Sequence, residues 1–144
     1  MRELRRESPR IGIDAMCWEL INGKEIGGIA VDLSPVGLRL ERPYTGGPTR
    51  HEVPLQIEVP GIDEVMWAKA DACFDVVVPH AGLAGGALGL VRRTGYRIVA
   101  AAARDLRMLR EFVVETDRAT RRTVELRAPA PDLDLGFASC YLRG

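Results

Sequence analysis

Three arginines stand close together near the start of the chain, at Arg5, Arg6 and Arg10. A guanidinium group donates two parallel hydrogen bonds, which suit the oxygens of a phosphate or the O6 and N7 edge of a guanine. Pro9 favours an extended backbone over a helix, so this segment can wrap around an anion that carries several charges. Taken alone, the same residues also fit a disordered, solvated basic leader.

A second group of polar residues lies between Asp32 and Gly37, in the sequence DLSPVG. The Asp32 carboxylate can accept hydrogen bonds from the amino or imino groups of a base, and the Ser34 hydroxyl can donate to a phosphate. Gly37 allows a backbone geometry or a close approach that other residues forbid. The alternative interpretation of this segment is an ordinary Asp-Ser-Pro turn between two strands.

The elements that must position these residues are mostly β-strands, because apolar and polar residues alternate along much of the chain. Alternation predicts strands over residues 11–17, 26–32, 38–41, 53–59 and 66–76. In the last of these, the apolar face is expected to include Phe74 and Val76. Asn22-Gly23 favours a tight type I′ turn, and Arg93-Thr94-Gly95 is interpreted as a turn between strands near 88–92 and 96–102.

The pattern changes after residue 103. Apolar residues then recur at intervals of three and four as far as about Glu115, which predicts an amphipathic helix. A second, weaker helical stretch is expected over 117–127, ended by Pro129 and Pro131. Short antiparallel strands followed by a helix predict a mainly all-β protein, with a closed or nearly closed barrel and the helix across one open end.

Composition excludes several classes of protein. The 144 residues fit one domain, and 20 Lys and Arg balance 20 Asp and Glu, so no bulk field attracts a nucleic acid polymer or a membrane surface. We expect no membrane insertion, because no apolar run is long enough to cross a bilayer. The charged N-terminus does not resemble a signal peptide, so we expect a cytoplasmic protein.

The side chains that usually form catalytic or metal sites are scattered. Cys17, Cys73 and Cys140 are odd in number and far apart, so we expect buried thiols in a reducing compartment. His51 and His80 are isolated in segments that read as loops. The glycine-rich run from 82 to 89 lacks the lysine of a phosphate-binding loop. We therefore expect no enzyme activity, no metal and no cofactor.

Together the two polar segments resemble the signature of the PilZ domain family, RxxxR followed at a distance by [D/N]xSxxG. The first half, in the fuller form RRxxxR, is matched by Arg5, Arg6 and Arg10. The second half, after 21 intervening residues, is matched by Asp32, Ser34 and Gly37. The resemblance extends over roughly residues 4–116 and implies a bacterial receptor for the second messenger cyclic di-GMP, with a six-stranded antiparallel barrel and a C-terminal helix.

The resemblance also implies a role for each matched residue. Arg6 and Arg10 would hold a phosphate and the Hoogsteen edge of a guanine, and Asp32 would hold another guanine edge. Ser34 would contact phosphate or base, and Gly37 would shape the turn.

Arg5 carries a further implication, since in this family an arginine directly before RxxxR accompanies two intercalated ligand molecules. We expect residues 1–10 to be a flexible switch segment that orders on ligand binding and alters a surface read by an unidentified protein effector. Residues 11–116 would form the barrel and its helix, and 117–144 a helical extension and tail. The alternative is a PilZ-type protein-interaction module that does not bind nucleotide.

Overall fold

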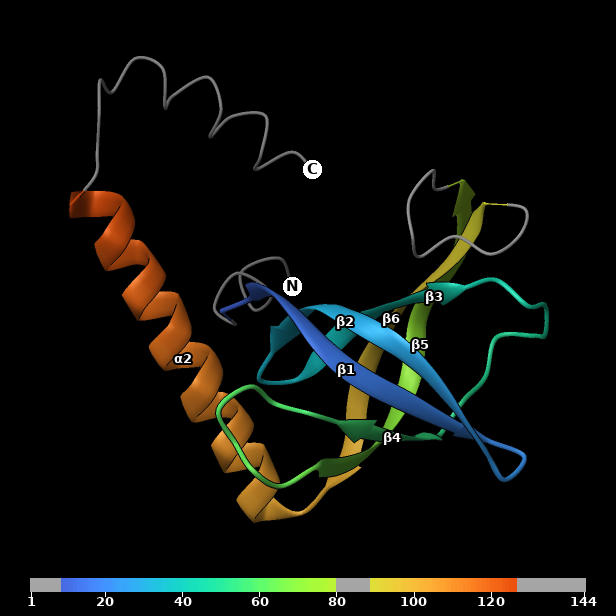
Figure 1. Cartoon of the computed structure of the whole chain (residues 1–144). Helices are drawn as coiled ribbons and strands as arrows, with labels where there is room; N and C mark the ends of the chain where they lie inside the picture. The colour runs from blue at the N-terminus through green and yellow to red at the C-terminus, as the bar shows by residue number, and fades with distance from the viewer. Residues whose placement is uncertain (1–8, 80–88, 127–144) are drawn as a thin grey trace.

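The computed structural model describes residues 9–79 and 89–126 (Figure 1). The elements in this part of the chain are β1 (Ile11–Ile21), β2 (Lys24–Ser34), β3 (Gly37–Pro43), β4 (Val53–Ile57), β5 (Met66–Pro79), β6 (Leu90–Ala101) and α2 (Ala103–Leu126). The strands form a closed antiparallel barrel in the order β1-β2-β3-β6-β5-β4. The predicted six-stranded barrel with a C-terminal helix is therefore confirmed.

The first hairpin forms where the sequence predicts it. Asn22 and Gly23 join β1 to β2, and both have positive φ angles, of 51° and 78°. A type I′ turn requires positive φ at both central positions, and asparagine and glycine tolerate it best. The turn pairs Ile21 with Lys24 and so sets the register of the hairpin.

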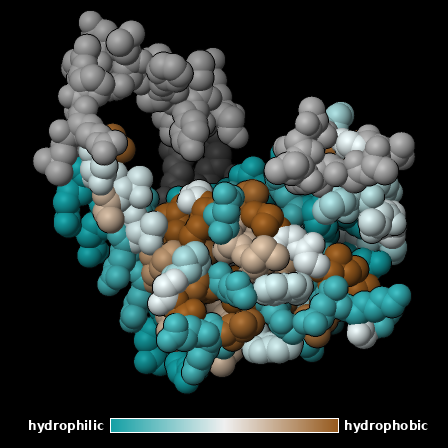
Figure 2. All heavy atoms as spheres, in the orientation of Figure 1, coloured by the Kyte–Doolittle hydropathy of each residue, from teal (hydrophilic) through white to brown (hydrophobic). Residues whose placement is uncertain are grey.

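The core lies inside the barrel and continues beneath the helix. Alternate strand positions point inward, and the largest of these side chains that are fully buried include Leu33, Leu40 and Leu55. Leu109 and Val113 of α2 belong to the same buried cluster. The helix lies beside the barrel and contacts β1 and β2 (Figure 1). Figure 2 shows apolar side chains gathered on this face between α2 and the strands.

The predicted turn at Arg93-Thr94-Gly95 is wrong, because these residues lie inside β6. They pair with β3 on one side and with β5 on the other, so their backbone groups belong to the sheet. Glycine occurs here because the Phe74 ring occupies the space beside it: a Cβ on Gly95 would lie 2.1 Å from a ring carbon. The two short strands predicted on either side of this turn are one strand.

The single apolar face predicted for β5 does not continue to the end of the strand. Met66, Ala68 and Ala70 are buried as expected, but Phe74 and Val76 are each 44% exposed. A register shift against β6 lies between Ala72 and Phe74. A bulge of this kind adds a residue to one strand and turns the following side chains to the other face.

The two predicted helical stretches form one continuous helix, α2. Asp117 and Arg121, one turn apart, form an ion pair of 3.2 Å directly after the junction. Such pairs stabilise a helix by about 0.2–0.5 kcal/mol, which favours continuation. The domain boundary expected after residue 116 falls within α2. In the described part of the chain, no helix has the length and apolar character that crossing a membrane requires.

Candidate functional site

A pocket of about 260 Å³ opens on the barrel surface over β2, β3, β5 and β6, beside the start of β1. The predicted site residues that line it are Arg10, Asp32, Ser34 and Gly37. The structure therefore places Arg10, the last residue of the first motif half, beside the second half, although 21 residues separate them in the sequence. Arg5 and Arg6 lie outside the described residues.

The connection between β2 and β3 within the segment from Asp32 to Gly37 is shorter than expected. Asp32 and Ser34 belong to the end of β2, Gly37 begins β3, and only Pro35 and Val36 connect them. The buried Ser34 hydroxyl accepts a hydrogen bond from the Val36 amide (3.2 Å) and donates to the Gly37 carbonyl (3.3 Å). Ser34 therefore holds the tight turn that presents its neighbours to the pocket.

Gly37 is required by the close approach of β6. A Cβ at this position would lie 2.1 Å from the Tyr96 carbonyl oxygen and 3.3 Å from the Arg97 Cα. The predicted close approach is confirmed, and the neighbour is the adjacent strand. The missing side chain lets β3 pair with β6 directly beneath the pocket.

Asp32 is paired with an arginine that the sequence analysis did not single out. Asp32 and Arg39 are partners in the β2–β3 register, and the Asp32 Oδ2 lies 2.8 Å from the Arg39 Nη2. A base that donates hydrogen bonds to Asp32 must therefore share the carboxylate with Arg39 or displace it. The alternation of Leu38, Arg39 and Leu40 placed Arg39 on the polar face of its strand, which was the available signal.

The far wall of the pocket comes from β5 and β6 and was also missed. It includes Cys73, Phe74 and Arg97. The Phe74 ring covers Gly95 and keeps part of its own surface exposed. Cys73 is exposed, so the expectation of a buried thiol is wrong there. The bulge that turns this stretch outward depends on pairing with β6, which the residues of β5 alone do not reveal.

Cys17 follows the expectation of a buried thiol. Burial, reinforced by the nearby Glu19 carboxylate, raises the pKa of the Cys17 thiol to about 12. A thiol with so high a pKa stays protonated at neutral pH and is a poor nucleophile. Cys140 and His80 lie outside the described residues, and His51 is exposed. Among the residues that the structure describes, no cluster of His, Cys, Asp or Glu is suited to hold a metal ion.

A buried ionic network occupies the barrel interior toward the other end of β1. Glu19, 2% exposed, binds the Arg42 guanidinium through both carboxylate oxygens, at 2.8 and 2.9 Å. Arg42 also donates to the Thr94 hydroxyl at 2.8 Å, and the Tyr96 hydroxyl donates to Glu19. Burial, together with the Glu19 charge, raises the pKa of the Tyr96 phenol well above its ordinary value. Tyr96 thus connects the network to the wall of the pocket.

The network continues to the loop between β3 and β4. Arg92 donates to both carboxylate oxygens of Asp75, with its Nη2 2.6 Å from Oδ2, and to the Gly46 and Pro48 carbonyls at 2.8 and 2.9 Å. Hydrogen bonds from Arg92, and to a smaller extent from Thr94, hold the pKa of Asp75 well below its ordinary value. No buried side-chain polar atom in the described residues lacks a partner. The charged side chains of this network therefore stabilise the fold by joining strands and the loop between β3 and β4.

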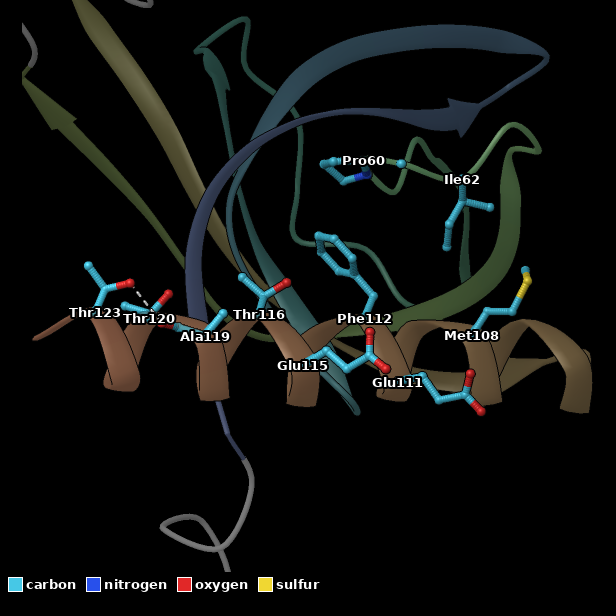
Figure 3. A pocket seen from close by; sticks show the side chains of 11 residues that line it. Pro60, Ile62, Met108, Glu111, Phe112, Glu115, Thr116, Ala119, Thr120 and Thr123 are labelled. Carbon is cyan, nitrogen blue, oxygen red and sulfur yellow. Dashed lines mark hydrogen bonds between the residues drawn. The ribbon is translucent and has the colours of Figure 1, made fainter. Parts of the chain in front are cut away.

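A larger cavity than the motif pocket lies elsewhere, between α2 and the loop around residue 61. It has a volume of about 690 Å³, and Figure 3 shows Phe112 pointing from the helix toward Pro60 and Ile62. Its ionisable lining residues are two carboxylates, Glu111 and Glu115. Without a basic side chain, this cavity is poorly suited to an anion. None of the predicted site residues lines it.

No protein-family model matches the chain, and no curated protein sequence matches it either. Several solved structures have a similar fold. MotI/DgrA, the inhibitor of motility of Bacillus subtilis, is 14% identical with a TM-score of 0.64, over 81% of this chain and 53% of that one. The MrkH–c-di-GMP complex of K. pneumonia is 15% identical with a TM-score of 0.60, over 83% and 55%.

The isolated PilZ domain of YcgR from Escherichia coli, solved with c-di-GMP, gives a comparison with a single domain. It is 18% identical with a TM-score of 0.58, and the match covers 84% of this chain and 98% of that domain. The chain therefore spans about half the length of MotI and MrkH and nearly all of the YcgR domain. In its closed six-stranded barrel and C-terminal helix, the chain has the fold of a PilZ domain.

Proposed function

We propose that the chain is a receptor for cyclic di-GMP that acts as a ligand-controlled adaptor and catalyses no reaction. The observation that carries the proposal is the pocket in which Arg10 meets Asp32, Ser34 and Gly37. A similar fold binds c-di-GMP in the YcgR domain and in MrkH, as their structures with the ligand record.

The chemistry of the pocket suits this ligand. Cyclic di-GMP carries two phosphates and two guanines, so a binding site needs cationic donors together with an acceptor for the base edges. Arg10 supplies a planar donor for phosphate oxygens or for guanine O6 and N7. Asp32 supplies an acceptor for the N1 and N2 groups of guanine. The Phe74 ring adds an exposed apolar surface beside them.

The described pocket forms one side of the proposed site. Its volume is about 260 Å³. Pockets that bind small ligands typically have volumes of about 300–1,000 Å³, so the described pocket is smaller than these. In our proposal, the segment that precedes Arg10 closes over the ligand and completes the site, with Arg6 bound to phosphate or guanine. Arg5 bonds or stacks on a guanine of a second, intercalated ligand molecule, so that each chain binds two.

Closure of this segment would change the surface next to the pocket. Pro9, at the base of the segment, lines a groove of about 620 Å³ between the barrel and α2. The groove also includes Val36 of the connecting turn and Leu106 and Val114 of the helix. Movement of the chain before Pro9 therefore alters access to an apolar groove, and we propose this groove as the surface that a protein effector reads.

Isothermal titration with cyclic di-GMP tests the proposal. We expect saturable binding with two ligands per chain, and loss of binding in Arg10→Ala with an unchanged circular dichroism spectrum. Arg107→Ala, an exposed arginine on α2 away from the pocket, is the matched control and should bind as the wild type does. A wild-type chain that gives no heat at saturating ligand contradicts the proposal, and one ligand per chain contradicts the intercalated pair.

The second candidate is a protein-interaction module that does not bind nucleotide. The cavity between α2 and the loop around residue 61 favours it, because it is larger than the motif pocket and is lined mainly by apolar and hydroxyl side chains. The two functions differ in their response to ligand. A receptor gains thermal stability when cyclic di-GMP is added, and a pure interaction module gains none.

A further inference from the structure

Arg97 lies on β6 at the edge of the motif pocket and belongs to neither motif half. Its Cα partners are Gly37 on β3 and Asp71 on β5. The residue is exposed, which keeps its guanidinium accessible from solution. The register thus places this arginine directly beside the glycine of the second motif half.

Only some of the charged side chains at the pocket form ion pairs in the described residues. The charged side chains that line it are Arg10, Arg39, Arg97 and Asp32. Asp32 is paired with Arg39 at 2.8 Å. Across residues 9–79 and 89–126, no ion pair involves Arg10 or Arg97. Within this part of the chain, two guanidinium groups at the pocket form no ion pair.

The strand order places these two arginines on opposite sides of the motif residues. Arg10 precedes β1, Asp32 lies on β2, Gly37 on β3 and Arg97 on β6, and these four strands are consecutive neighbours in the barrel. Neighbouring strands are about 4.8 Å apart, so the path along the curved sheet from Arg10 to Arg97 covers three strand spacings, about 14 Å. Both arginines line the same pocket, so a compact ligand seated there lies within reach of each of them.

The surroundings of Arg97 strengthen its attraction for an anion. The exposed Phe74 ring and the backbone of Gly95 form an apolar wall on the same side of the pocket. A ligand seated against this wall excludes water from the nearby charges. Charge pairs are then stronger than in open solvent, because the effective dielectric constant is lower.

We propose that Arg97 is a second anion-binding residue of this site, which binds one phosphate of a cyclic dinucleotide from the side opposite Arg10. This inference rests on the proposed function. Two guanidinium groups that form no ion pair in the described residues match the two phosphates of the ligand, while a guanine edge shares the Asp32 carboxylate with Arg39 or displaces it. The site then extends across four strands and does not depend on the two motif halves alone.

Isothermal titration of the full chain with cyclic di-GMP tests the role of Arg97, using Arg97→Gln, Arg97→Lys and the control Arg107→Gln. Loss of a charge-assisted hydrogen bond weakens binding by about 10- to 100-fold, which we expect for Arg97→Gln. Arg97→Lys keeps the charge but loses the planar pair of donors, so its affinity should lie between the other two. Arg107→Gln should match the wild type.

The outcomes separate this inference from the proposed function. Wild-type affinity in Arg97→Gln, with binding lost in Arg10→Ala, overturns the role of Arg97 and leaves the receptor proposal standing. Equal weakening in Arg97→Gln and in the control Arg107→Gln also overturns it, because the loss is then not specific to the pocket. A wild-type chain that binds no cyclic di-GMP overturns both. Circular dichroism of each variant shows whether a loss of affinity comes from unfolding.

Discussion

Gly37 links the geometry of the pocket to the stability of the barrel at the level of a single residue. The Tyr96 carbonyl oxygen occupies the position that a side chain at residue 37 would need. Since both β3 and β6 are held by neighbouring strands, neither can move aside without breaking ladder hydrogen bonds. The glycine of the motif is therefore a packing requirement as well as a feature of the site.

We predict that Gly37→Ala destabilises the protein, because overpacking of this kind costs about 1–3 kcal/mol. Urea unfolding followed by circular dichroism measures the change. Gly12→Ala on β1 is the matched control, since a Cβ there meets no atom within 4 Å, and it should leave the free energy of unfolding nearly unchanged. Equal stability of the two variants would contradict the close approach of β6.

Some residues of the candidate site can be predicted from the sequence, because they belong to motifs whose members lie close together along the chain. Arg10, Asp32 and Gly37 were identified from motifs in which each residue lies a few positions from the next. Arg39 and Arg97 were missed because their place in the site depends on strand register. Which residue of β6 lies beside Gly37 is decided by the pairing of β3 with β6, more than fifty positions along the chain.

At the scale of elements, alternation and turn residues predict most strands correctly. The predictions for β5 and β6 fail where the same sequence feature can arise from two different physical causes. Glycine at position 95 favours a turn when only the neighbouring residues are considered, whereas in the barrel it makes room for Phe74 on the adjacent strand. The change of face along β5 comes from a bulge formed against β6. Both features are properties of paired strands and are absent from either strand alone.

The ion pair of Asp75 and Arg92 joins three elements, since Arg92 on β6 binds Asp75 on β5 and the carbonyls of the β3–β4 loop. The pKa of Asp75 is depressed in the folded protein below its ordinary value near 3.8, chiefly by hydrogen bonds from Arg92. A carboxyl whose pKa is depressed by folding stabilises the folded state above the unfolded pKa. That contribution is lost as the pH falls further toward the folded pKa.

We predict that the free energy of unfolding falls as the pH is lowered below about 4, in part through Asp75. Asp75→Asn should be less stable than the wild type at pH 7, and the difference should shrink toward pH 3. Urea unfolding at pH 7, 5, 4 and 3 measures it. The exposed Asp63 provides the control variant Asp63→Asn. A difference between Asp75→Asn and wild type that stays constant over this range contradicts the role given to the pair.

For the whole molecule, zero net charge is compatible with an anionic ligand. A neutral total removes the long-range field that binds polyanions, but it places no limit on a local arrangement of arginines. Within the described residues, the buried arginines that form ion pairs are structural: Arg42 inside the barrel and Arg92 against Asp75. Two of the arginines at the motif pocket, Arg10 and Arg97, form no ion pair in this part of the chain, so the binding of a compact dianion that we propose is a local property.

Binding at that pocket should stabilise the whole barrel, because the pocket exists only when β2, β3 and β6 are assembled. A ligand that binds the folded chain alone adds about 2.7 kcal/mol at 100 times its Kd, and each kcal/mol raises Tm by about 2–4 °C for a domain of this size. We therefore predict a Tm rise of several degrees with cyclic di-GMP by differential scanning fluorimetry.

In Arg6→Ala the rise should be lost while the Tm without ligand is unchanged, since the segment before Pro9 then lacks its proposed phosphate contact. Arg2→Ala removes the same charge from the same segment outside the motif and should keep the full rise. Equal responses in these two variants would show that the segment acts through its charge alone and not through the motif spacing.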